Sequence, residues 1–236
     1  MNEASAGTAP QIAATANKLN WLRAGVLGAN DGIVSTSSII FGVAGASASH
    51  ATVVLAGIAA IAAGAMSMAA GEYISVSSQR DLEEAQLALE RTEIARDPEG
   101  ELAELTHLLE ERGIDRRLAR KVAMQLTERD ALSAHARLEF GIDPSAVSNP
   151  WSAAVASMIA FTAGGLIPLL SMVLASRSIE IWVSGVAVLV ALTLTGWISA
   201  HLGGAPKLPS IVRNVAGGLL AMAVTFGIGK IAGTQV

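Results

Sequence analysis

Residues 51–71 read ATVVLAGIAAIAAGAMSMAAG, a stretch without a single charged side chain. A helix needs ~20 apolar residues to cross the ~30 Å hydrocarbon core of a bilayer. The stretch therefore predicts a transmembrane helix, and it is followed directly by Glu72. A second carboxylate, Asp31, lies alone in the otherwise uncharged stretch Ala24–Ala48. A carboxylate at bilayer depth costs about 2.5–3.5 kcal/mol on insertion scales, so such a residue usually serves an ion or a proton.

The rest of the chain has the same apolar character, with 52% hydrophobic residues, 15% charged residues and a mean hydropathy of +0.50. This composition predicts an all-α membrane protein. Five transmembrane helices are expected, because four further stretches reach spanning length: Ala24–Ala48, Trp151–Ser176, Ile181–Ala200 and Pro209–Ala232. Met1–Asn20 has no apolar core, so no signal peptide is expected there. No basic stripe indicates a nucleic-acid partner.

Most charged residues fall between the second and third spans, where Gln79–Ser145 carries 16 acidic and 10 basic side chains. Capping and breaking residues predict three helices in this insert, at about Val76–Arg96, Pro98–Arg112 and Arg116–Phe140. The predicted organisation is an N-terminal segment (1–23), spans one and two (24–75), a helical metal-binding insert (76–145) and spans three to five (150–236).

Basic residues indicate the orientation in the membrane. Lys18 and Arg23 precede the first span and the insert is rich in arginine, whereas the loop Gly45–His50 has neither Lys nor Arg. We therefore expect the N-terminal segment and the insert to lie in the cytoplasm. The chain has no cysteine, which excludes disulfides and thiolate metal sites. Together with the short loops, this favours a multi-pass protein of a bacterial inner membrane.

Small residues crowd the predicted spans and allow helices to approach closely. They fit tight packing within one bundle at least as well as a dimer interface. Because five helices enclose a conduit poorly, a homodimer with a shared pathway is expected. The small residues are Gly57, Ala60, Gly64, Gly71, Gly164, Gly165, Gly217 and Gly218.

Asp31, Met68 and Glu72 form a candidate metal site within the membrane. Met68 and Glu72 are separated by four residues and so share a helix face. Carboxylate and thioether ligands suit a divalent first-row transition ion better than calcium or magnesium. Each residue has a plainer interpretation: a helix cap for Asp31, core packing for Met68, and a hydrated or protonated interface position for Glu72.

A second candidate metal site lies in the insert. Glu90 and Glu93 are three residues apart, and so are Glu101 and Glu104 beyond the Asp97-Pro98 turn. The turn reverses the chain, so the two pairs can face one another. Converging carboxylates repel, and a cation relieves the repulsion. On the third insert helix, His135 and Glu139 share one face and add a nitrogen ligand. Taken singly, these are the ordinary residues of a solvated helix surface.

The segments Asn30–Thr36 (NDGIVST) and Ser67–Ser75 (SMAAGEYIS) resemble the vacuolar iron transporter family over nearly the whole chain. The resemblance implies a homodimer that exports ferrous iron, and often manganese, from the cytoplasm in exchange for protons. It implies that Asp31 and Met68 bind the metal in the membrane. It also assigns the two glutamate pairs and Glu139 to a cytoplasmic site. Some members have methionines one turn before that last glutamate, where this chain has His135 and Ala136.

The expected function is therefore secondary active transport of a divalent transition metal, with metal ions, protons and membrane lipid as partners and no prosthetic group. A membrane-anchored di-iron ferroxidase is an alternative, since carboxylate bundles hold two irons through Glu-x-x-His motifs. Ala131–Ala134 precede His135 without such a glutamate, which disfavours it. A metal sensor is a further alternative that leaves Asp31 and Glu72 unexplained.

Overall fold

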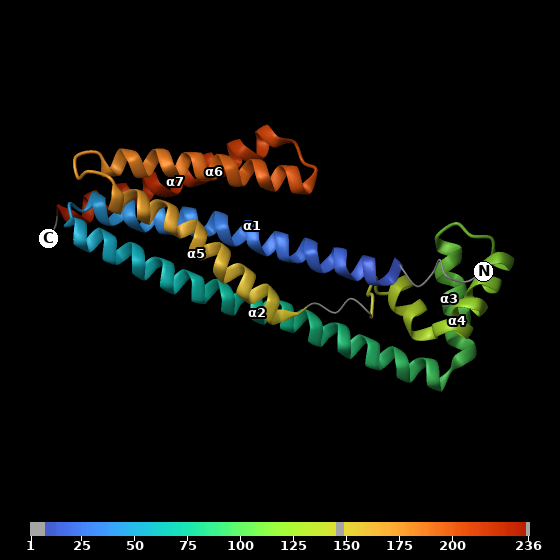
Figure 1. Cartoon of the computed structure of the whole chain (residues 1–236). Coiled ribbons are helices and arrows are strands. Elements are labelled where there is room, and N and C mark those ends of the chain that lie inside the picture. The colour runs from blue at the N-terminus through green and yellow to red at the C-terminus, as the bar shows by residue number, and fades with distance from the viewer. Residues whose placement is uncertain (1–7, 145–148, 235–236) are drawn as a thin grey trace. The chain divides into compact units, whose positions relative to one another are not determined.

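The computed structural model describes residues 8–144 and 149–234, with side chains from Ala24 onward. Every regular element in the described residues is a helix (Figure 1). Five of these helices are long and apolar enough to cross a membrane, which confirms the predicted number. In chain order the helices are α1 (Thr8–Gly45), α2 (His50–Arg96), α3 (Pro98–Glu111), α4 (Arg116–Leu138), α5 (Pro150–Leu174), α6 (Glu180–Gly203) and α7 (Lys207–Gly233).

The helices differ from the predicted ones in two places. α1 begins at Thr8, so the helix of span one extends back through most of the segment predicted as a separate N-terminal part. α4 is not continuous, because Asp130 has the extended backbone angles φ −168°, ψ 92°. The Asp130 side chain accepts hydrogen bonds from both the amide and the hydroxyl of Ser133. It therefore caps a second helical segment that carries His135.

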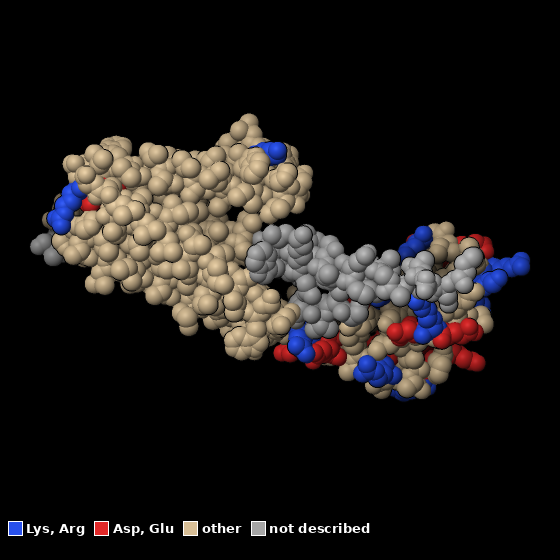
Figure 2. Space-filling model, viewed as in Figure 1, with Lys and Arg blue, Asp and Glu red and all other residues tan. Residues whose placement is uncertain are grey.

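The chain divides into two compact units, described separately. The insert unit lies within Ser75–Asn149, and the membrane unit consists of Leu19–Ile74 and Pro150–Val236. α2 belongs to both, and it is one helix without a break. Figure 2 shows that the charged side chains gather on the insert unit, whereas the visible surface of the membrane unit is almost free of them.

The insert unit has a small core of its own between α3 and α4. Leu105 and Leu109 pack against Ala119 and Ala123, and all four are buried. The predicted caps are present: the Asp97 carboxylate accepts the Gly100 amide before α3, and Asp115 accepts the Arg117 amide before α4. This core fixes where α3 and α4 present their acidic side chains.

In the membrane unit, several helices are in backbone contact through glycine. A Cβ on Gly229 of α7 would overlap the carbonyl oxygen of Gly42 in α1. Likewise, Gly64 of α2 faces the ring of Phe161, and Gly164 of α5 faces the backbone of Ala29. Tertiary packing within one chain therefore accounts for these small residues, as expected for apolar bundles in lipid. Gly71 and Gly217, by contrast, face open space.

We expect Gly229→Ala to destabilise the membrane unit by roughly 1–3 kcal/mol, because overpacking forces the α1 and α7 backbones apart. Gly227→Ala is the matched control, since nothing lies within 4 Å of a Cβ at that position of the same helix. Alanine is the better helix former, so this variant keeps or gains stability. Thermal unfolding in detergent measures both; equal melting temperatures would contradict the close α1–α7 contact.

Candidate functional site: a carboxylate–histidine cluster and a membrane cavity

The insert unit brings together side chains from three helices. Nδ1 of His135 lies 3.0 Å from Oε1 of Glu90, 3.6 Å from Oε2 of Glu101 and 3.8 Å from Oε2 of Glu139. Glu90 comes from α2 and Glu101 from α3, while Glu139 caps the end of α4. Ligand atoms of Glu90, His135 and Glu139 all lie within 4.8 Å of one another. The four residues are therefore close enough to share one cation.

Glu90 and His135 are almost completely buried, with 1% of each exposed. Neither Oε1 of Glu90 nor Nδ1 of His135 has a hydrogen-bond partner, although the two atoms face one another. Buried polar atoms in proteins nearly always have a partner. The two atoms lie 3.0 Å apart, so one cation bound to both would satisfy them together. This burial excludes the plain interpretation of His135 and Glu90 as solvated surface residues.

The electrostatics of the cluster also favour a cation. Burial, as the main cause, and the charges of the neighbouring Glu101, Glu93 and Glu104 together raise the pKa of Glu90 to about 7. Burial is also the main reason that the pKa values of Glu101 and Glu139 are raised. Bringing this many carboxylates together is unfavourable until a proton or a cation binds. A metal ion bound here would compete with protons for the same oxygens.

Glu93 and Glu104 are exposed and lie at the edge of the cluster. Both act on the pKa of Glu90, so they are near enough for their charges to matter. The predicted opposition of the two glutamate pairs therefore agrees with the geometry. The inner member of each pair, Glu90 or Glu101, approaches His135, and the outer member faces solvent.

This arrangement predicts a pH dependence of stability in the metal-free protein. Glu90 lies in the insert unit, and its pKa is raised in the folded state from 4.5 to about 7. Protonated Glu90 therefore stabilises the folded state. This stabilisation is complete below pH 4.5 and is lost as the pH rises through about 7. One pKa unit is worth about 1.4 kcal/mol, so the upper limit is roughly 3 kcal/mol.

We expect Glu90→Gln to melt at a higher temperature than the wild type at pH 8, with the difference vanishing at pH 4. Thermal unfolding in a chelating buffer measures it. Parallel pH profiles for the two proteins would contradict the buried position of Glu90. Glu84→Gln, which removes an exposed carboxylate from the same helix, is the control and leaves the profile unchanged.

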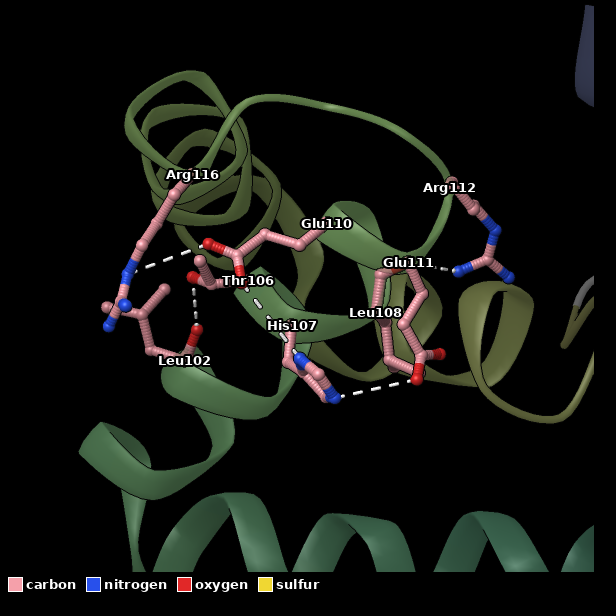
Figure 3. A network of polar contacts seen from close by, with 8 residues as sticks. All are labelled: Leu102, Thr106, His107, Leu108, Glu110, Glu111, Arg112 and Arg116. Carbon is pink, nitrogen blue, oxygen red and sulfur yellow. Dashed lines mark hydrogen bonds and ion pairs between the residues drawn. The ribbon is translucent and has the colours of Figure 1, made fainter.

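Other charged residues of the insert unit form ordinary surface pairs. Figure 3 shows one such network between α3 and the start of α4, in which His107 contacts Glu111 at 3.5 Å and Glu110 contacts Arg116 at 3.6 Å. His107 is exposed, with 68% of its side chain accessible. Exposed pairs of this kind contribute little to stability.

In the membrane unit, Asp31 and Met68 line one cavity of about 430 Å³. Asp31 lies in the middle of α1, which excludes the alternative that it caps a helix. Its Oδ1 accepts a hydrogen bond of 2.6 Å from the Ser35 hydroxyl one turn later. Met68 comes from α2 and faces the same space. The cavity thus offers carboxylate oxygen and thioether sulfur to one ion, a set that suits divalent transition metals.

Glu72, one turn beyond Met68 on α2, is partly buried and is not among the described residues that line this cavity. The sequence grouped it with Asp31 and Met68, and the structure does not bring the three together there. Two lining residues were missed, Arg213 and Asn214 of α7. Arg213 was visible in the sequence only as a charge near the edge of span five.

Comparison with known proteins gives a consistent result. The model of the VIT family matches residues 22–230. A protein of Acanthamoeba castellanii named "Vacuolar iron transporter" is 45% identical over 230 residues, which cover 93% of this chain and 82% of that protein. "Vacuolar iron transporter homolog 4" of Arabidopsis thaliana is 37% identical over 219 residues, 92% of this chain and 87% of the relative. The chain is therefore a member of the VIT family.

Proposed function

We propose that this protein exports ferrous iron from the cytoplasm in exchange for protons, and that it also accepts manganese. The observation that carries the proposal is the cavity of the membrane unit, where Asp31 and Met68 face the same space. A carboxylate this deep in an apolar bundle is costly unless an ion or a proton uses it. The names of the relatives, which describe iron transporters, support the choice of metal.

Each group of residues has a distinct role in this proposal. The insert unit, placed in the cytoplasm, collects the metal through Glu90, Glu101, His135 and Glu139, with Glu93 and Glu104 at its edge. Asp31 and Met68 bind the ion in the membrane. Protons that enter from the opposite side neutralise carboxylates and displace the metal. Glu72 serves either as a further ligand or as the proton carrier, and the second role is favoured because Glu72 is not among the described residues that line the cavity.

The proposal includes a homodimer in the bacterial inner membrane. Five helices provide little shelter for a pathway, and Gly71 and Gly217 leave small-residue surfaces open in a single chain. Such surfaces allow close helix contact between subunits. Cross-linking in native membranes, with cysteines introduced at these two positions of the cysteine-free chain, tests this part.

Proteoliposomes test the transport cycle directly. Purified protein is reconstituted with a pH-sensitive dye inside, and ferrous iron or manganese is added outside under anaerobic, reducing conditions. We expect metal uptake together with proton release from the vesicles. Metal uptake without proton movement would contradict the exchange mechanism. Oxygen consumption on adding ferrous iron in air, without metal uptake, would support the ferroxidase alternative instead.

A further inference from the structure

The membrane cavity contains a cationic side chain as well as a carboxylate. Arg213 and Asn214 reach it from α7, opposite Asp31 on α1. A guanidinium carries a permanent positive charge. Asp31 and Arg213 are the only charged residues among the nine described residues that line the cavity. The lining is therefore electrically neutral before any ion enters, which is unexpected for a site that binds a divalent cation.

Nothing else in the described part of the chain accounts for Arg213. It makes no ion pair with any described residue, so no acid among these residues neutralises it directly. It lies six residues after Lys207, the first residue of α7, or ~9 Å along the helix. The plain alternative is that its side chain extends to the membrane surface, as long basic side chains near helix ends do. The two interpretations predict different transport kinetics.

We propose that Arg213 sets the affinity of the cavity for its metal and speeds metal release. This inference rests on the proposed transport function. Like charges repel, so a guanidinium that lines the same cavity as a divalent ion lowers the affinity of that cavity for the ion. A transport site must bind its ion firmly enough to load and weakly enough to unload. Asp31 and Met68 supply the attraction, and Arg213 opposes it.

The test is Arg213→Gln, which removes the charge and keeps a polar side chain. In manganese uptake by proteoliposomes we expect KM to fall roughly tenfold, with a parallel fall in kcat because the ion leaves more slowly. Arg213→Lys keeps the charge, so its constants are expected to stay closer to those of the wild type than those of Arg213→Gln. Lys230→Gln removes a charge near the other end of α7 and leaves both constants unchanged.

The proposal is overturned if KM in Arg213→Gln is unchanged or higher, if Arg213→Lys behaves like the glutamine variant, or if Lys230→Gln has the same effect. Equilibrium binding of manganese in detergent separates this inference from the transport function. It is measured in full-length protein carrying Glu90→Ala, which weakens the insert site. If the wild type fails to transport, the proposed function fails. Tighter binding in Arg213→Gln then still supports the role of Arg213, and equal binding overturns it.

Discussion

Asp31→Ala is expected to abolish metal transport, with a loss of at least about 100-fold in uptake rate. Residues that only support a metal ligand cost 10–100-fold when replaced, and Asp31 is the one acidic residue among the described residues that line the membrane cavity. Without it, the permanent charge of Arg213 is unopposed and repels the ion. Initial rates of manganese or ferrous iron uptake into proteoliposomes measure the effect.

Asp31→Asn separates charge from shape, because the amide has nearly the size of the carboxylate. It too is expected to be inactive while melting at the wild-type temperature. Ser35→Ala removes only the hydrogen bond to Asp31 and is expected to reduce the rate much less. Transport that persists in Asp31→Ala and fails in Glu72→Ala would contradict this assignment and move the metal site towards the end of span two.

Glu90→Ala is expected to lower the metal affinity of the insert unit by about 100-fold or more. The substitution removes the carboxylate nearest to His135, whose Nδ1 lies 3.0 Å from Oε1 of Glu90. Calorimetric titration with manganese or cobalt measures the affinity. The full-length protein with Asp31→Asn is used, so that the insert unit supplies the remaining site.

Two comparisons make this result specific. Glu84→Ala removes an exposed glutamate of α2 that pairs with Arg80, and it is expected to leave the affinity unchanged. His135→Ala is expected to weaken binding as Glu90→Ala does, and to reduce the preference for transition metals over calcium, which favours all-oxygen ligands. Equal affinities in Glu90→Ala and Glu84→Ala would show that the buried cluster is not the binding site.

The helical architecture was predictable because its signals are local. An apolar run of ~20 residues satisfies its backbone within one helix in lipid, so length and composition suffice to locate it. The same holds for the caps at Asp97 and Asp115. The break in α4 was not predicted: Asp130 lies among good helix formers, and only the observed backbone shows that its side chain caps the following turn.

The candidate sites were predictable in part. Spacing along one helix grouped Glu90 with Glu93 and Glu101 with Glu104, and the family was identified from two motifs that the comparisons confirm. Which member of each pair is buried could not be deduced, since burial depends on where α4 returns. Spacing also grouped Glu72 with Met68. The cavity next to Met68 is instead lined by Arg213, which comes from a helix more than 140 residues away in sequence.

By itself, the sequence determined the number of spans, the charged insert between the second and third, and the residue types available to a metal. These follow from hydropathy and from contacts within one or two helical turns. Only the tertiary structure decided that Glu90 and His135 are buried together and that Asp31 and Met68 share a cavity with Arg213. Such groupings depend on helix packing between distant segments, where close contacts at glycines such as Gly229 set which side chains meet.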